Sequence, residues 1–329
     1  MQEVDFGSGE LKVRIQGTNT AAALEAQYVY DEAADTILDR EENVLYQADD
    51  DQGKFVSADG CELVPGYTVR TGVANYIRFL NNPAFRGPLA RVFIWTVVFA
   101  LLGTLLSFSL GLLIAIAFGR DMPGQKIIKS LLIIPFAISN VISILVWRGL
   151  WNSLNGPVAS LVSSILGNSI NVFADPTGVK FALVFINLWL AYPYYVLINS
   201  GALQAIPRSL YKAAKIDGAN WWNQFRHITL PLLLVGVGPL LIGSFMVSFN
   251  AFNVIYLFND GGPPMVGTPT PAGHSDILIS YVSRLAFSSG GQDFGYATAI
   301  TMIIFLILAG MTFFQYRFMR VWEEVGENV

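Results

Sequence analysis

The sequence predicts an all-α membrane protein with five transmembrane helices and a small acidic region at its amino end. Hydrophobic residues make up 53% of the chain and charged residues only 13%. Several apolar runs reach the roughly 20 residues that a helix needs to cross the hydrocarbon core of a bilayer. The acidic side chains gather before the first of these runs. This composition excludes a soluble globular domain for most of the chain.

Residues 1–70 differ from the remainder. They hold 15 of the 24 acidic side chains against 5 basic ones, and their apolar runs are short, as in Leu11–Ile15. We expect a small, strand-rich α/β region outside the cytosol, followed by an interfacial helix over Val73–Leu80. A partly disordered tail is the alternative, because Ala21–Asp39 shows no clear period. Cys61 is the only cysteine, which excludes an internal disulfide and a cysteine metal cluster.

The expected spans occupy most of residues 71–329. Each is an apolar run of about 20 residues or more, which is the length that a membrane-crossing helix requires. Loops with charged or polar residues separate the runs. The five predicted spans are Val92–Phe118, Ile128–Leu150, Phe181–Leu203, Ile228–Leu257 and Ala297–Met319.

Basic residues predict the orientation, because Lys and Arg of short loops are retained on the cytosolic side. On one side of the spans lie Arg120, Lys126, Lys129, Arg208, Lys212, Lys215, Arg226, Arg317 and Arg320. The opposite loops offer only Arg148, Lys180 and Arg284 over two longer stretches. We therefore expect a periplasmic amino terminus and a cytoplasmic carboxyl terminus, with residues 206–231 forming a cytoplasmic loop.

This 206–231 loop contains the most informative string, SLYKAAKIDGANWWNQFRHITLPLL, which begins at Ser209. Its pattern predicts a helix up to Asp217, a turn at Gly218 and a second short helix over Asn220–Ile228. The two helices would lie along the membrane surface. An ordinary amphipathic connector between two spans is the alternative interpretation.

The string resembles the loop of binding-protein-dependent ABC importer permeases, in which Glu-Ala-Ala and Asp-Gly-Ala precede Ile-x-Leu-Pro. The resemblance implies a coupling helix that inserts into a cleft of a partner ATPase. One position departs from the pattern, because Lys212 replaces a glutamate expected to face an arginine of the ATPase, and like charges repel. The matching residues are Ala213, Ala214, Asp217, Gly218, Ala219, Phe225, Ile228, Leu230 and Pro231.

The resemblance thus implies that the partner ATPase supplies the energy for the activity of this chain. The sequence contains no Gly-x-x-x-x-Gly-Lys-Ser/Thr motif for binding ATP phosphates, so we expect no enzyme activity of its own.

Other segments narrow the resemblance to the larger membrane subunit of maltose/maltodextrin permeases, over about residues 66–319. It implies a type I ABC importer core in the bacterial inner membrane. In that family further spans and a large loop precede the core, so residues 1–65 resemble the tail of that loop and the earlier spans would be missing or come from another chain. The segments are FIWTVVF (93–99), LLIIP (131–135), NLWLAYPY (187–194), SFMVSFNAF (244–252), TPAG (270–273) and GGQDFG (290–295).

The partners that this resemblance implies are a second, homologous permease, an ATPase dimer, an extracytoplasmic sugar-binding protein and membrane lipid. It implies no cofactor, metal or nucleic acid. The expected mechanism is alternating access of a central cavity.

Polar and aromatic residues on three spans are the candidate sugar site. A sugar exchanges water for protein hydrogen bonds and stacks its rings on aromatic side chains. On the second span, Phe136 and Asn140 are four residues apart and share a face. The third and fourth spans follow the i, i+3, i+4, i+7 pattern, and Ala251 is the last residue of that pattern on the fourth span. The resemblance places sugar contacts at these positions. The expected lining residues are Phe136, Asn140, Asn187, Leu190, Ala191, Tyr194, Ser244, Val247 and Ser248.

Several alternatives stay open. Asn and Ser inside membrane helices also form hydrogen bonds between helices. The solute could be trehalose or glycerol phosphate, although the spans offer a phosphate almost no basic residue beyond Arg148. The chain could also be a truncated subunit that does not transport. An intramembrane enzyme is disfavoured, because no His or Cys lies in a span and Asp175, Asp260 and Asp276 fall in loops.

Overall fold

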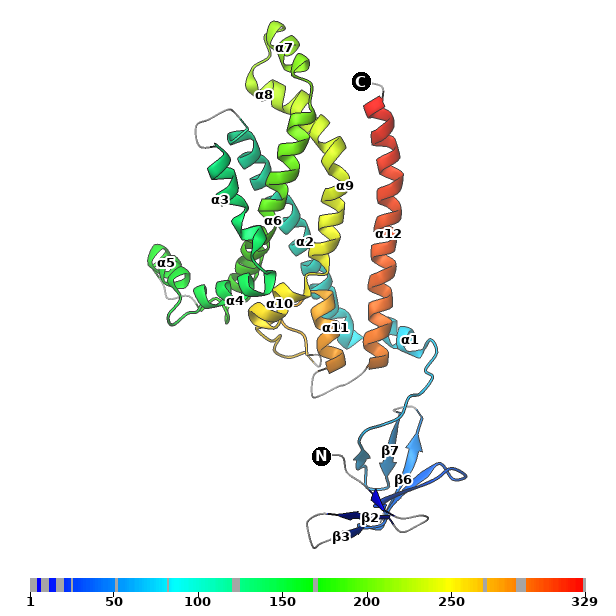
Figure 1. Ribbon diagram of the computed structural model, residues 1–329. Coiled ribbons are helices and arrows are strands. Elements are labelled where there is room, and N and C mark those ends of the chain that lie inside the picture. Colours follow the sequence, from blue (N-terminus) through cyan, green and yellow to red (C-terminus); the bar gives the residue numbers. More distant parts are fainter. Residues whose placement is uncertain are drawn as a thin grey trace. The chain divides into compact units, whose positions relative to one another are not determined.

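The chain divides into two compact units, Met1–Ala74 and Asn75–Val329. The first is built from strands and the second from helices (Figure 1). The computed structural model describes residues 5–6, 12–15, 21–24, 26–50, 53–81, 83–119, 125–167, 171–268, 271–287 and 294–327.

The amino-terminal unit contains two antiparallel sheets whose strands follow chain order. Ile37 pairs with Tyr46 and Gln47 pairs with Val56 in the larger sheet. Asn43 turns the chain between two of its strands at a positive φ of 54°, a conformation that asparagine tolerates well. The three-stranded sheet holds β1 (Asp5–Phe6), β2 (Lys12–Ile15) and β3 (Ala21–Leu24), and the five-stranded sheet holds β4 (Tyr28–Asp31), β5 (Thr36–Asp39), β6 (Val44–Asp49), β7 (Lys54–Ser57) and β8 (Glu62–Leu63).

The predicted strand-rich region is therefore confirmed. Residues 21–39, for which disorder was the alternative, contain three of the strands. The helix predicted over Val73–Leu80 is present as α1 (Ala74–Asn81).

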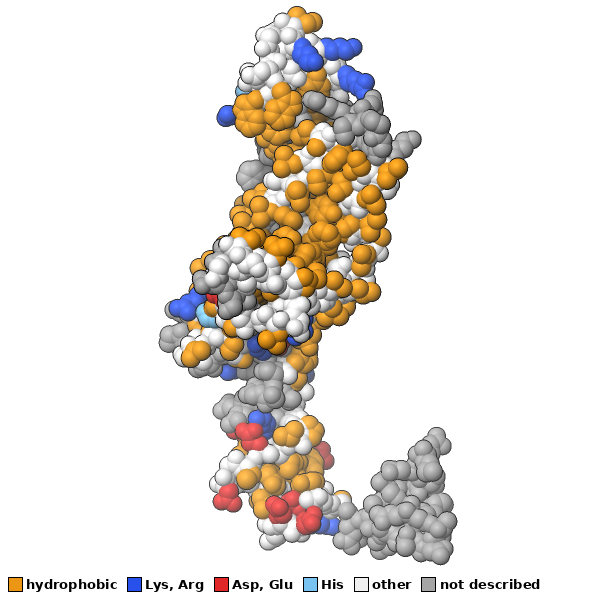
Figure 2. Space-filling view, turned by 90° about the vertical axis from the view of Figure 1, so that its left-hand side faces the viewer, with side chains coloured by type: hydrophobic (Ala, Val, Ile, Leu, Met, Phe, Trp, Pro, Cys, Tyr) orange, Lys and Arg blue, Asp and Glu red, His pale blue; other side chains and the backbone are white. Residues whose placement is uncertain are grey.

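The second unit is helical along most of its length. Hydrophobic side chains cover the flank of this helical unit, as expected of a surface that faces lipid (Figure 2). Its further elements are α2 (Pro83–Ala117), α3 (Gln125–Ala137), α4 (Asn140–Leu150), α5 (Pro157–Leu166), α6 (Pro176–Ala205), α7 (Arg208–Ile216), α8 (Trp221–Gln224), the π-helix η1 (Phe225–Thr229), α9 (Leu230–Phe249), α10 (Phe252–Asn259), α11 (Leu278–Phe287) and α12 (Phe294–Glu327).

Among the described residues, four segments are long and apolar enough to span a membrane, and a bent pair of helices makes a fifth when it is counted as one span. The prediction of five spans is thus confirmed. The four single segments are Gly87–Ala117, Pro176–Ala205, Trp221–Asn259 and Phe294–Phe314.

The second predicted span is not one straight helix, and this corrects the sequence-based expectation. Ser130–Ala137 and Asn140–Leu150 meet at 99°. Pro135 lies in the last turn of α3, where its missing N–H weakens the helix. Ser139 then adopts an extended conformation, with φ −53° and ψ 133°, and α4 begins in a new direction. Serine and asparagine both favour such a helix start.

Close packing of α2 against α6 forms the centre of the helical unit. A Cβ atom at Gly111 would lie 2.8 Å from the carbonyl carbon of Tyr195 and 2.9 Å from the backbone nitrogen of Val196. Only glycine fits there. Small residues of this kind let membrane helices approach each other closely.

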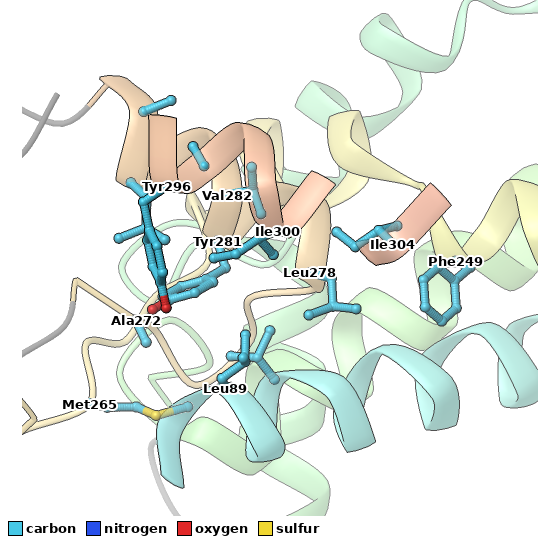
Figure 3. Close-up of a cluster of buried hydrophobic side chains, with 14 of the residues drawn as sticks. Leu89, Phe249, Met265, Ala272, Leu278, Tyr281, Val282, Tyr296, Ile300 and Ile304 are labelled. Carbon is cyan, nitrogen blue, oxygen red and sulfur yellow. The ribbon is translucent and has the colours of Figure 1, made fainter. Parts of the chain in front are cut away.

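A second packed region joins α2, α9, α11 and α12. Leu89, Phe249, Leu278, Tyr281 and Ile300 all belong to one buried cluster, and Figure 3 shows them converging from these four helices. In Figure 1, α11 lies at the end of the helical unit opposite α7, so this cluster packs that end of the unit.

The segment between α10 and α11 is held by Asp276, whose side chain is 0% exposed. Its carboxylate accepts hydrogen bonds from the Gly273 nitrogen at 2.6 Å and from Ser280 Oγ at 2.9 Å, and it lies 3.3 Å from Nη2 of Arg284. Burial raises the pKa of the Asp276 carboxyl, while the Arg284 charge and the hydrogen bonds oppose the rise. One buried carboxylate therefore connects the segment to α11.

Candidate functional site

A cavity of about 660 Å³ lies where α3, α4, α6, α9 and α10 meet. All nine residues predicted from the sequence line it, namely Phe136, Asn140, Asn187, Leu190, Ala191, Tyr194, Ser244, Val247 and Ser248. The other lining residues are Ile144, Tyr195, Pro239, Leu240, Gly243, Asn250, Ala251, Phe252, Asn253 and Val254. The structure thus brings the three predicted faces together around one space.

The α6 wall follows the predicted helical spacing. Asn187, Leu190, Ala191 and Tyr194 lie on successive turns of one continuous helix, so their side chains face the same direction. Asn187 is buried against α9, whereas Tyr194 is partly exposed. This wall offers the cavity an amide at one level and an aromatic ring two turns further along.

Asn187 and Ser248 also bond to each other. Nδ2 of Asn187 donates to Oγ of Ser248 at 3.3 Å, and both side chains are buried. This hydrogen bond joins α6 to α9, which is the interhelical role that polar residues often have in membranes. Asn140, Tyr194 and Ser244 are therefore better placed than this pair to exchange hydrogen bonds with a solute.

The bend between α3 and α4 forms another wall. Phe136 and Asn140 were expected on one face of a single helix, but they lie on opposite sides of the bend, since α3 ends at Ala137 and α4 starts at Asn140. Both line the cavity nevertheless. Phe136 is 54% exposed, so an aromatic ring stands free at the wall.

The break between α9 and α10 adds residues that the sequence-based prediction missed. The fourth span was expected to be helical through Leu257, but α9 ends at Phe249 and α10 begins at Phe252. Ala251 consequently has ψ 56°, outside the helical range, instead of continuing the helical face. Asn250 and Asn253 flank this break and line the cavity. The sequence signal that could have predicted them is the presence of two asparagines in an otherwise apolar run.

The lining determines which solutes fit. None of the nineteen lining residues carries a charge. Amides and hydroxyls supply hydrogen bonds, and aromatic rings supply flat apolar surfaces. This combination suits a neutral, polyhydroxylated solute, because a charged solute would lose its hydration without gaining a counter-charge.

The 206–231 loop has the predicted helix, turn and helix. Residues Arg208–Ile216 form α7, Asp217 ends it, and Gly218 adopts a positive φ of 79°. Ala219 N donates to the carbonyl of Ala214 at 2.8 Å, which closes the turn. The second helix was expected to be a separate short helix over Asn220–Ile228, but α8 ends at Gln224, the π-helix η1 continues to Thr229, and the chain then runs directly into α9.

Side-chain hydrogen bonds help to fix this loop. The Asn220 side chain accepts from the Asn223 nitrogen at 2.9 Å and caps α8. Nε2 of Gln224 donates to the Ala219 carbonyl at 2.9 Å. The Tyr211 and Thr229 hydroxyls lie 3.0 Å apart and join α7 to η1.

The remaining predicted loop residues occupy defined places. Lys212 and Ala213 are exposed on α7, and Ala214 is half-buried. Ile228 lies in η1, while Leu230 and Pro231 begin α9. The loop is therefore continuous with the helix that lines the cavity, since η1 leads directly into α9.

The chain is similar to known membrane components of transport systems. Residues 107–321 match the family model described as binding-protein-dependent transport system inner membrane component. Curated relatives include the maltose/maltodextrin transport system permease protein MalF of Vibrio vulnificus, 37% identical over 330 residues, which cover 97% of this chain and 62% of that protein. MalF of Escherichia coli K12 is 39% identical over 284 residues, covering 84% of this chain and 55% of that protein.

The chain spans about three fifths of the length of the curated relatives it matches. Among solved structures, a bacterial ABC transporter involved in the import of the acidic polysaccharide alginate has a chain with a TM-score of 0.64 at 20% identity, covering 76% of this chain and 84% of that one. At this identity the likeness concerns the fold, which is that of an ABC importer permease. Such permeases are membrane components and not enzymes. The chain belongs to the family of binding-protein-dependent transport system inner membrane components.

Proposed function

We propose that this chain is the membrane-spanning permease subunit of an ABC importer for maltose or maltodextrin. The uncharged cavity carries the proposal, because its amides, hydroxyls and aromatic rings match the chemistry of a neutral sugar. The MalF relatives support the choice of maltose. The lack of charge in the lining disfavours phosphorylated solutes.

The proposed assembly contains a second, homologous permease, an ATPase dimer and an extracytoplasmic sugar-binding protein. The amino-terminal sheets would face the periplasm, as the tail of a longer loop, and the 206–231 loop would face the cytosol. The basic residues of this loop support that orientation.

The proposed mechanism is alternating access. ATP closes the ATPase dimer, which holds the 206–231 loop, and the movement reaches the cavity through η1 and α9, since these form one continuous segment. The cavity then opens outward, receives sugar from the binding protein, and returns inward after hydrolysis.

Single alanine variants test whether the cavity binds the solute. Tyr194→Ala and Asn140→Ala should each raise the KM for maltose uptake roughly tenfold, a loss of about 1.4 kcal/mol of binding. Leu197→Ala is the matched control for Tyr194→Ala, because Leu197 lies three residues further along α6, is exposed and does not line the cavity. It should leave the KM unchanged.

Uptake is measured in reconstituted complexes with equal amounts of assembled protein. Unchanged kinetics in both cavity variants would contradict a solute-binding role. Competition by unlabelled trehalose as strong as that by maltose would contradict the assignment of the sugar and leave the cavity assignment standing.

A further inference from the structure

A second cavity, of about 740 Å³, lies at the end of the helical unit that carries α7 and α8 (Figure 1). We call it the loop cavity, because α2 and α6 form one of its walls and α7, α8 and η1 of the 206–231 loop form the other. None of its described lining residues lines the candidate sugar site. Its volume lies within the range of roughly 300–1,000 Å³ that is typical of ligand sites.

Arg208 gives the loop cavity a positive charge. It is the first residue of α7, and it is exposed. No carboxylate is among the described residues that line the cavity, and none of the described carboxylates forms a salt bridge with Arg208. Pro207 precedes α7 without a side-chain cap, so the first N–H groups of this helix remain available to an acceptor. A guanidinium beside a helix amino end favours an anion, above all a phosphate, which arginine contacts through two parallel hydrogen bonds.

Polar groups of α6 and α8 supply hydrogen bonds for hydroxyl groups. Nε2 of Gln204 donates to the Ser200 carbonyl at 3.0 Å, and Nε2 of Gln224 donates to the Ala219 carbonyl at 2.9 Å. This arrangement leaves the side-chain oxygen of each glutamine as an acceptor for a ligand hydroxyl. The Ser200 hydroxyl is buried and has no hydrogen-bond partner among the described residues. An unpaired buried hydroxyl costs free energy, which a ligand at this wall would recover.

Aromatic rings complete the lining of the loop cavity. The Trp221 and Phe225 rings stack with their centroids 5.7 Å apart and 11° between their planes. The Tyr211 hydroxyl lies 3.0 Å from the Thr229 hydroxyl, which holds the tyrosine ring in place. Flat apolar faces of this kind suit the ring of a ligand whose polar groups point toward α6 and Arg208.

We propose that the loop cavity binds a phosphorylated polyhydroxy compound such as a hexose phosphate. Its phosphate lies at Arg208 and the amino end of α7, its hydroxyls bond to Gln204 and Gln224, and its ring lies on the aromatic side chains. This ligand differs from the neutral solute of the candidate sugar site, whose described lining carries no charge. Soluble sugar phosphates and phosphatidylglycerol headgroups share this chemistry, so the experiment includes both.

A bound ligand should slow transport, a consequence that rests on the proposed permease function. The ligand would join α2 and α6 to α7 and α8, whereas alternating access requires the 206–231 loop to move relative to the spans. A ligand that fits one arrangement of these walls better than another shifts the population toward that arrangement. The loop cavity would thereby act as a regulatory site.

Calorimetric titration of the assembled complex in phosphatidylcholine nanodiscs tests the binding. The probe is glucose 6-phosphate, and glucose and inorganic phosphate are the comparison ligands. We expect the probe to bind more tightly than either, because it alone satisfies both Arg208 and the glutamines. Arg208→Gln should weaken its binding roughly tenfold, as expected for a lost hydrogen bond to a charged group. Lys215→Gln is the matched control and should bind like wild type, because Lys215 is exposed on α7 and does not line the cavity.

Native mass spectrometry separates the two sources of phosphate. The complex is purified from a mixture of phosphatidylcholine and phosphatidylglycerol. Retention of phosphatidylglycerol by wild type and by Lys215→Gln, but not by Arg208→Gln, would support the proposed chemistry and assign the phosphate to a lipid headgroup. Titration by glucose 6-phosphate without such retention would assign it to a soluble ligand.

The proposal is wrong if neither phosphate source binds, or if Arg208→Gln binds the ligand as tightly as wild type. Glucose that binds as tightly as glucose 6-phosphate would also contradict it, since the phosphate would then contribute nothing. Maltose uptake that is insensitive to saturating glucose 6-phosphate inside the vesicles would overturn the regulatory role. Absence of maltose uptake without any added ligand would instead contradict the proposed permease function, and the titration would still decide the binding site.

Discussion

Gly218 is the residue on which the shape of the 206–231 loop depends. Its φ of 79° lies in the left-handed region, and no heavy atom lies within 4 Å of a Cβ placed there. Gly218→Val therefore introduces backbone strain of roughly 1–2 kcal/mol without a steric clash. We expect ATP-dependent uptake to fall roughly 5–30-fold, as that strain implies for a docking equilibrium, while the protein stays in the membrane.

Gly236→Val is the control for this prediction. Gly236 lies in α9 with no neighbour within 4 Å of a Cβ and no positive φ. Its variant should transport normally. Normal uptake by Gly218→Val at equal membrane levels would contradict the docking role of the turn.

Asp276 is the residue whose loss should cost the most stability in the described part of the segment between α10 and α11. Asp276→Asn weakens the buried pair with Arg284 and removes one of the acceptors for Gly273 and Ser280, so we expect a loss of about 2 kcal/mol. Asp260→Asn should cost less than about 1 kcal/mol, because Asp260 is exposed and lies 3.7 Å from Arg284. Thermal unfolding of the detergent-solubilised protein measures both, and equal shifts would contradict this assignment.

The cavity residues show what spacing can predict at this scale. Residues Asn187, Leu190, Ala191 and Tyr194 could be grouped because an uninterrupted helix repeats every 3.6 residues. Asn250 and Asn253 could not, because their orientation depends on the end of α9 at Phe249. The bond between Asn187 and Ser248 also required the relative positions of two helices.

At the scale of elements, the contact between α2 and α6 is the most sensitive to size. Gly111→Val would place methyl groups against the backbone of Tyr195 and Val196, so the two helices must separate. We expect a loss of about 1–3 kcal/mol, seen as a lower midpoint of thermal unfolding in detergent. Gly87→Val, on the same helix with no neighbour within 4 Å of a Cβ, should leave the midpoint nearly unchanged. Equal midpoints in the two variants would show that α2 does not pack as described.

The number of spans could be predicted from hydropathy, but their internal breaks could not. Length and apolar composition are local properties, and five spans follow from them. The 99° bend after Pro135 also has a local signal, yet proline is tolerated inside α6 at Pro193, where the helix continues. Neighbouring helices decide which proline ends a helix, so the sequence alone could not distinguish the two.

At the scale of the whole molecule, the single cysteine reports the orientation. Cys61 is exposed in the amino-terminal unit, so a membrane-impermeant thiol reagent should label it in right-side-out vesicles and not in sealed inside-out vesicles. Ile216→Cys in a Cys61→Ser background should show the reverse pattern, since Ile216 is exposed on α7. Labelling of both positions from the same side would contradict the proposed topology.

Uptake of radiolabelled maltose by vesicles is the most direct measurement of the proposed function. The vesicles contain this chain with its second permease, ATPase and sugar-binding protein, and uptake is compared with and without ATP. We expect accumulation that requires ATP and is competed by unlabelled maltose. Absence of ATP-dependent accumulation in vesicles whose subunits are shown to be assembled would contradict the proposal that this chain forms a maltose pathway.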